Sequence, residues 1–183
     1  MSLRMRLENL LPSKDDARVL EFCGRISCDG PPFYVPVLPE PGFWAIQCLT
    51  NVPRKVEMAG GEVVRGWEVS QVPKMFLEAR FHAVWKTPAG DFVDVTPEEF
   101  GMSRVLFLPD ARYRDTEPAV PRHRFSLAHD KAAVERYWSV SDELLSLMQS
   151  DAWGAIRADD PSMQSHISRL QTEARTIRER LQK

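Results

Sequence analysis

The sequence predicts an α+β protein in which an antiparallel sheet occupies the middle of the chain and helices precede and follow it. Three runs between residues 62 and 96, and a fourth at 103–110, combine alternating polarity with β-branched and aromatic residues, as strands do. Helical patterns begin at Ser13, near Ser126 and after residue 160. The 183 residues are enough for one main domain and a terminal appendage.

We expect an N-terminal extension at 1–12, a main domain at 13–150 and a C-terminal helix at 160–183. The N-terminus lacks the apolar core of a signal peptide, and no stretch of the chain is apolar enough for a membrane-spanning helix. The three cysteines are an odd number and too few for a disulfide scaffold, which favours a reducing compartment such as the cytoplasm. A net charge of −2 makes nucleic acid an unexpected partner.

Prolines limit the secondary structure expected in the first sixty residues. The helix from Ser13 is expected to stop at Gly24, and the proline-rich stretch 29–41 to form a connector that is neither helix nor central strand. Within 42–59, Pro53 predicts either a kinked helix or two short helices that meet near Asn51. Asn51 is a good N-cap for the second of these helices.

After the sheet, residues 111–124 are expected to form a polar loop, followed by an amphipathic helix that ends near Met148. The loop contains four arginines, but nearby Asp and Glu residues dilute their charge and no glycine-rich cradle accompanies them. A solvated loop is therefore favoured over a phosphate site. The arginines are Arg112, Arg114, Arg122 and Arg124.

Apolar residues in the tail follow alternating steps of four and three, the spacing of a coiled-coil seam. Most of the other tail positions are charged or polar. The tail therefore predicts an element for oligomerisation or for binding a partner helix. The alternative is a terminal helix docked on its own domain. The seam consists of Met163, Ile167, Leu170, Ala174, Ile177 and Leu181.

A hairpin centred on Pro88 would place His82 opposite Asp94, with both side chains on one face of the sheet. A hydrogen bond between them is then expected, and it would fix the histidine tautomer and favour the imidazolium. In the same register Arg80 and Thr96 flank the pair on that face. The opposite face is more apolar and is expected to meet the core.

Such a histidine would suit a nearby thiol, because thiol chemistry requires the thiolate and an adjacent imidazolium stabilises it. Cys48 is the best-placed cysteine, since it comes immediately before the sheet. Cys23 and Cys28 precede the proline-rich connector.

The order of Cys48, a glycine-containing strand, His82 and Asp94 resembles the core of transglutaminase-like proteins within the papain-like superfamily. The sequence around His82 is similar to that family's aromatic-containing strand. The stretch from Gly90 through Asp94 to Pro97 is similar to its glycine turn and the following strand, which ends in an aspartate. The resemblance covers about fifty residues and implies a papain-like core. Pro53, five residues after Cys48, departs from the uninterrupted helix that the family usually places after its cysteine.

The resemblance implies a cysteine-dependent hydrolase or acyltransferase that acts on a protein or peptide amide, without a cofactor or metal. Cys48 would attack the acyl carbon, His82 would donate a proton to the leaving amine and Asp94 would orient His82. Water as acceptor makes the enzyme a peptidase or deamidase, and an amine makes it a transferase. The backbone amide of Cys48 with Gln47 or Trp44, and also Trp85, are the expected oxyanion or substrate-binding groups.

Two other interpretations use the same residues. The fold would serve as a non-catalytic scaffold that binds partners through its tail helix, with Cys48 as a small buried apolar residue. Alternatively, two cysteines and two histidines would bind zinc, since their spacings are near those of structural zinc sites. That ligand set is Cys23, Cys28, His123 and His129.

Overall fold

The computed structural model describes residues 11–97, 101–119, 121–149 and 161–183. These residues form two compact units. The first comprises the chain up to Val72 and Leu77–Phe125, and the second comprises Pro73–Phe76 and Ser126–Lys183. The helix expected to end near Met148 therefore belongs with the tail and not with the sheet.

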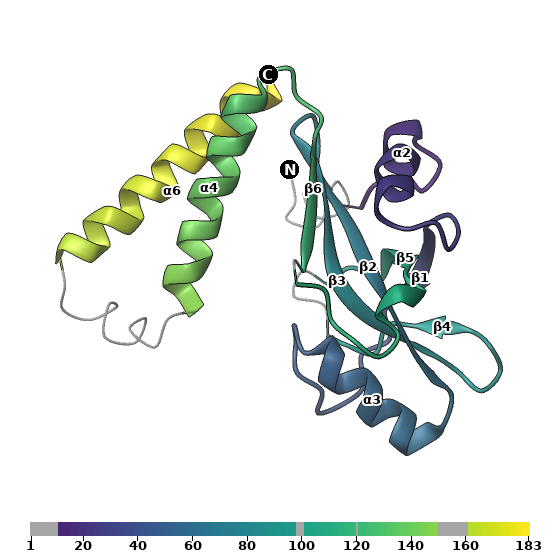
Figure 1. Cartoon of the computed structure of the whole chain (residues 1–183). Helices are drawn as coiled ribbons and strands as arrows, with labels where there is room; N and C mark the ends of the chain where they lie inside the picture. Colours follow the sequence, from purple (N-terminus) through teal and green to yellow (C-terminus); the bar gives the residue numbers. More distant parts are fainter. Residues whose placement is uncertain (1–10, 98–100, 120, 150–160) are drawn as a thin grey trace. The chain divides into compact units, whose positions relative to one another are not determined.

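The first unit is built on a six-stranded sheet, as the α+β prediction requires. The spatial order along its path is β1-β5-β2-β3-β4, and β6 pairs with β3 outside this path. The two longest strands, β2 and β3, run side by side at its centre (Figure 1). The strands are β1 Phe33–Pro36, β2 Glu62–Val72, β3 Phe76–Lys86, β4 Phe92–Val93, β5 Arg104–Pro109 and β6 Arg122–Ser126.

Two of these strands lie where the sequence predicted none. β1 falls in the proline-rich connector and pairs along its length with β5, at the end of the strand order. Pro36 is tolerated there because an edge strand does not need every backbone donor. β6 lies in the expected polar loop, as does a short 3-10 helix, η1 (Ala111–Tyr113).

The outer strands of this order also meet at one point. Val37 forms an isolated parallel bridge with Asp94. Asp94 donates its N–H to the Pro36 carbonyl at 2.9 Å and accepts from the Leu38 N–H at 2.9 Å. The backbone of Asp94 is therefore fixed through both its N–H and its carbonyl, although β4 itself ends one residue earlier.

Two helices complete the first unit. α2 (Ala17–Ile26) is capped by the Asp16 carboxylate, which accepts from the Arg18 N–H, and it continues two residues beyond the expected stop at Gly24. α3 (Cys48–Ala59) is a single helix that contains Pro53, so of the two expected arrangements the one with two short helices that meet near Asn51 is wrong. It ends at Gly60, whose N–H bonds the Val56 carbonyl.

Both faces of β3 are buried, so the expectation that only the face opposite His82 meets the core is too narrow. Ala83 packs in a cluster with residues of α3, including Cys48 and Val52. Val84, on the same face as His82, packs with Phe107 and other residues of the neighbouring strands.

The second unit is a pair of helices, α4 (Lys131–Gln149) and α6 (Pro161–Gln182), that pack against each other (Figure 1). Three ion pairs join them, at distances of 2.7 to 2.9 Å. Residue numbers rise along one helix as they fall along the other, so the two helices are antiparallel. The pairs are Asp130–Arg180, Arg136–Glu173 and Glu143–His166.

α6 therefore already has a partner helix within its own chain. Leu170, in the middle of the predicted seam, is buried, and the other seam residues are half-covered. This agrees with the alternative of a terminal helix docked on its own chain. Whether the seam also joins copies of the protein stays a prediction.

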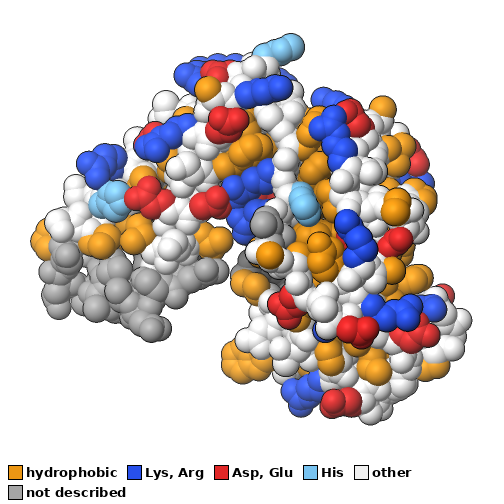
Figure 2. Space-filling view, in the orientation of Figure 1, with side chains coloured by type: hydrophobic (Ala, Val, Ile, Leu, Met, Phe, Trp, Pro, Cys, Tyr) orange, Lys and Arg blue, Asp and Glu red, His pale blue; other side chains and the backbone are white. Residues whose placement is uncertain are grey.

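No helix in the described part of the chain has the length and apolarity needed to cross a bilayer. Acidic and basic side chains are interspersed on the visible face, without a broad surface of one sign (Figure 2). That nucleic acid is not a partner stays a prediction.

Candidate active site

Cys48 is the first residue of α3, and its side chain is buried, with 7% of its surface exposed. The Gln47 carbonyl accepts the N–H groups of Thr50 and Asn51, which closes the first turn. The Gln47 side chain makes no capping hydrogen bond. The Cys48 N–H has no acceptor within the helix, because the first N–H groups of a helix never do. The positive end of the helix dipole therefore lies at the cysteine.

His82 and Asp94 form the predicted hydrogen bond. His82 Nε2 lies 2.8 Å from Asp94 Oδ2, and both side chains are buried. The Cys48 side chain also hydrogen-bonds the His82 ring. Since Nε2 is engaged with Asp94, Nδ1 is the nitrogen available to the sulfur. The structure thus brings together the three residues that the sequence singled out.

The strand register that led to this pair is nevertheless wrong by two residues. Trp85 pairs with Val93 and Lys86 with Phe92, whereas the hairpin centred on Pro88 predicted Ala83 with Val93. Continuing the observed register places Thr96, and not Asp94, opposite His82. A shift of two preserves the face from which each side chain projects, so the histidine and aspartate still meet, along a diagonal.

The surroundings of His82 favour its charged form. Burial alone would lower the pKa of the imidazole. The interactions of the ring with Asp94 and Cys48 outweigh burial and hold the pKa of His82 well above its ordinary value. At neutral pH the ring is therefore an imidazolium between a sulfur and a carboxylate.

Asn51 and Thr96 form hydrogen bonds around Cys48, His82 and Asp94. The sequence predicted a role in the site for neither of them. Asp94 Oδ1 accepts the Thr96 N–H at 2.9 Å, which leaves Oδ2 for the histidine. Asn51, one turn after Cys48, donates to the Trp44 carbonyl at 2.7 Å and to Thr96 Oγ1 at 3.3 Å. This amide links the helix, the loop before it and the segment that carries Asp94.

The loop before Cys48 combines backbone strain with exposed apolar side chains. Ile46 has a φ of 67°, which is an outlier for a β-branched residue. Such strain often occurs at functional sites. Trp44 and Ile46 are 71% and 76% exposed, and Gln47 is exposed as well. Trp44 and Gln47 are thus exposed and lie close to Cys48 along the chain, and their part in substrate binding stays a prediction.

Trp85 does not line the cavity at Cys48. Its indole N–H donates to the Gly60 carbonyl at 2.8 Å, at the C-terminal end of α3, and Lys55 lies over its ring. The position of Trp85 indicates that it fixes the far end of the helix. A part for Trp85 in substrate binding stays a prediction.

The cavity at Cys48 has a volume of about 120 Å³. Besides the three residues of the hydrogen-bonded chain, Thr96 and Ile46 line it, together with the charged side chains of Glu68 and Arg80. Arg80 lies two residues from His82, and alternation along the strand predicted it on the same face as the pair. The local sequence does not place Glu68 at the site, because this residue of β2 comes close to His82 only when β2 pairs with β3.

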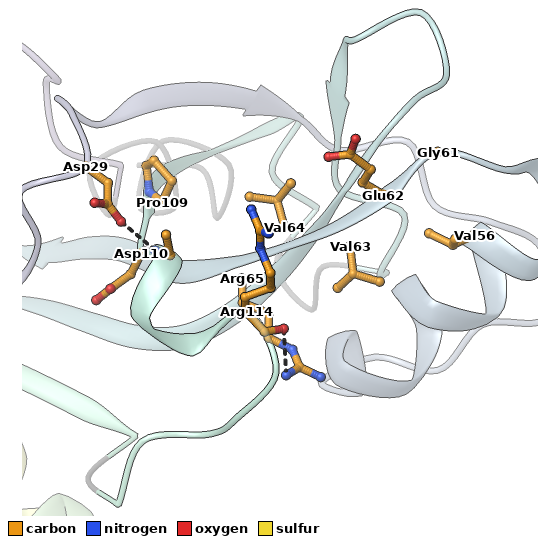
Figure 3. Close-up of a pocket in the computed structure, with 11 residues that line it drawn as sticks. Asp29, Val56, Gly61, Glu62, Val63, Val64, Arg65, Pro109, Asp110 and Arg114 are labelled. Atoms are coloured by element: carbon orange, nitrogen blue, oxygen red, sulfur yellow. Dashed lines mark hydrogen bonds between the residues drawn. The ribbon is translucent and has the colours of Figure 1, made fainter.

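A larger cavity of about 500 Å³ shares no lining residue with the first (Figure 3). Several of its polar groups hold the fold, although Nε of Arg65 is buried without a hydrogen-bond partner among the described residues. Asp29 accepts the Ala111 N–H, Asp110 accepts from the Trp67 indole, and Arg65 reaches the Arg114 carbonyl. The residues that line it include neither a cysteine nor a histidine, so it offers no nucleophile–base pair.

The alternative zinc site is not assembled. In the described ranges, no three His, Cys, Asp or Glu side chains lie together in a way that would hold a metal ion. Burial in the core raises the pKa of Cys23 to about 12, which disfavours the thiolate that zinc requires. His123 instead packs against the Trp67 ring, with 4.5 Å between the centroids.

No family model, curated protein or solved structure matches this chain.

Proposed function

We propose that the protein is a cysteine-dependent hydrolase or acyltransferase with Cys48 as nucleophile, His82 as acid–base and Asp94 as the residue that orients the histidine. The observation that carries this proposal is the continuous hydrogen-bonded chain from the sulfur through the imidazole to the carboxylate, which begins at a helix N-terminus. A transglutaminase-like, papain-like core is part of the proposal. It is supported by the cysteine at the start of a helix beside an antiparallel sheet.

In the first half of the reaction, the Cys48 thiolate attacks the acyl carbon of an amide and forms a carbon–sulfur bond. The carbonyl electrons move to oxygen, and the Cys48 N–H at the start of α3 is placed to stabilise that charge. The intermediate collapses as the carbon–nitrogen bond breaks and His82 gives its proton to the leaving amine. The products are an acyl-enzyme and a free amine or ammonia.

In the second half, neutral His82 takes a proton from water or from an acceptor amine, which then attacks the thioester. Cys48 leaves as the thiolate, and His82 is again the imidazolium. Substrate enters beside the exposed side chains of Trp44 and Ile46, which suit a protein or peptide segment better than a small polar solute. The need for a free thiol favours a reducing compartment such as the cytoplasm.

The burial of Cys48 favours a second candidate function. A sulfur with 7% of its surface exposed, in a cavity of about 120 Å³, also suits an inactive scaffold in which the cysteine only packs. In that case partners would bind through the helical second unit, and His82 with Asp94 would be a buried structural pair.

The pH dependence of alkylation by iodoacetamide separates these functions. Cys28 is exposed and serves as the reference thiol in the same molecule. Below about pH 8 an ordinary thiol loses about tenfold in rate per pH unit, because only the thiolate reacts. We expect Cys48 to react at a nearly constant rate between pH 8 and pH 6. The slope of the profile is the readout, so the limited access to Cys48 does not affect the comparison.

The matched variant is His82→Gln, which should give Cys48 a slope like that of Cys28. Cys28 and Cys48 lie on the same tryptic peptide, residues 26–54, so tandem mass spectrometry with fragment ions that separate the two sites would report each cysteine from one sample. Parallel slopes for Cys48 and Cys28 in the unmodified protein would rule out the enzyme and leave the scaffold.

A further inference from the structure

Two charged side chains with no part in the proposed chemistry line the cavity at Cys48. Glu68 lies on β2 and Arg80 on β3, and their carboxylate and guanidinium are 3.4 Å apart. Arg80 precedes His82 by two residues on the same strand, so both side chains project from the same face. The guanidinium is therefore a neighbour of the reacting groups.

This ion pair leaves much of the guanidinium unused. Only Nη2 of Arg80 reaches Glu68, at 3.4 and 3.5 Å, near the limit for a hydrogen bond. Nε of Arg80 is buried and has no hydrogen-bond partner among the described residues. The Glu68 side chain is 11% exposed and that of Arg80 is 43% exposed. The carboxylate thus holds the arginine from the protein side, while the guanidinium remains accessible with spare donors.

The other acidic side chain on this face of β3 is held by arginines of β6. Glu78 projects from the same face as Arg80, because the two are separated by two residues on β3. Arg124 and Arg122 of β6 reach Glu78 at 2.9 and 3.8 Å. Glu78 is thus paired with arginines other than Arg80. The Asp94 carboxylate is paired with His82 at 2.8 Å. Among the described residues, Glu68 is the acidic group that pairs with Arg80.

We propose that Arg80, held by Glu68, is an anion subsite that binds a carboxylate next to the acyl group attacked by Cys48. The substrate class is then an acidic peptide, whose carboxylate belongs to an Asp or Glu side chain or to the chain terminus. The planar guanidinium suits a carboxylate because it can donate two parallel hydrogen bonds. This inference rests on the proposed function for its meaning as a substrate subsite.

The test compares iodoacetate with iodoacetamide, which differ in charge and react with the same thiolate. The readout is the ratio of their rates at Cys48, divided by the same ratio at Cys28. Changes in the thiolate fraction cancel in this quotient. We expect Arg80→Gln to lower it about fivefold, the effect of one unit charge at roughly 4 Å in water. Arg80→Lys should stay within about twofold of the unmodified protein, because it keeps the charge.

Glu68→Gln is the opposite test and keeps the side-chain shape. Removing its negative charge should raise the quotient, and this variant decides the question if Arg80→Gln does not fold. Arg18→Gln, on exposed α2, is the control and should change nothing. A quotient unchanged by both Arg80→Gln and Glu68→Gln would overturn the subsite. Parallel pH slopes of Cys48 and Cys28 would instead refute the proposed function, whatever the quotient.

The source of the carboxylate is distinguished by protection of Cys48 from iodoacetamide. Three capped tripeptides serve as probes: one with a central glutamate, one with a free C-terminal carboxylate and one neutral. Stronger protection by one of the acidic peptides, lost in Arg80→Gln, identifies the source. Equal protection by all three, or equal failure to protect, contradicts selection of an acidic peptide.

Discussion

The charge on His82 depends on its partners more than on its burial. Burial acts against the imidazolium, yet the interactions with Asp94 and Cys48 reverse the balance. His123 provides the contrast within the same unit. Burial and the nearby Arg112 guanidinium lower the pKa of His123, and Asp110 compensates only in part. The pKa values of these two histidines, one buried and one half-buried, are thus shifted in opposite directions.

We therefore predict that at pH 7 His82 is doubly protonated and His123 is neutral. Long-range ¹H–¹⁵N correlation spectra distinguish the two states, because the ring nitrogens of an imidazolium have similar shifts and those of a neutral ring do not. Replacing Asp94 by Asn should return His82 toward neutrality and leave His123 as it was. A neutral His82 at pH 7 in the unmodified protein would contradict the hydrogen-bonded chain.

Single residues also show what the sequence could and could not predict. The hydrogen bond between His82 and Asp94 is confirmed although the register is wrong. Alternate residues of a strand project from the same face, so a register error of two residues leaves both side chains on the same face of the sheet. Asn51 was interpreted as a helix cap from its residue type. Its actual role depends on Trp44 and Thr96, and on a contact that spans 45 residues. No local pattern encodes such a contact.

At the scale of elements, proline was the main source of error. Pro36 and Pro53 each suggested an interruption, but one lies in an edge strand and the other inside a continuous helix. Tertiary pairing decides whether a missing N–H matters, and local sequence does not report that pairing. The long strands β2 and β3 were predicted well, because their alternation and β-branched content are local properties.

The junction between α3 and β2 depends on Gly61. Its φ is +89°, and a Cβ there would lie 2.2 Å from the Lys86 carbonyl oxygen and 2.8 Å from Trp85 Nε1. We predict that Gly61→Ala lowers the free energy of unfolding by more than about 2 kcal/mol, through strain and the loss of the indole hydrogen bond. Urea unfolding followed by circular dichroism would measure the change.

Gly24→Ala is the matched control of opposite sign. Gly24 lies inside α2, and nothing is within 4 Å of the position that a Cβ would occupy. Alanine should stabilise this helix by about 0.5–1 kcal/mol, because it loses less backbone entropy on folding. A Gly61→Ala variant as stable as Gly24→Ala would show that the helix end can move away from β3.

At the scale of the whole molecule, the chain divides between a sheet unit that carries the candidate site and a helical unit that does not. The division could not be predicted from the sequence, because α4 follows the sheet without a composition change and its pairing with α6 is set by side chains along both helices. The ion pairs between the helices are partly exposed, and such pairs contribute little each. The apolar seam must therefore supply most of the stability of the helical pair.

The contribution of the seam to the stability of the α4–α6 pair can be measured at Leu170. Leu170 is 3% exposed, and Leu170→Ala should destabilise the α4–α6 pair by about 2–4 kcal/mol through lost burial and a cavity. Hydrogen exchange should accelerate along both helices, while the pH profile of Cys48 alkylation stays as in the unmodified protein. Arg175→Ala, at an exposed position of α6, is the control and should leave exchange nearly unchanged. If Leu170→Ala also altered the Cys48 profile, the two units would be energetically coupled and the helical pair would have to be counted as part of the catalytic machinery.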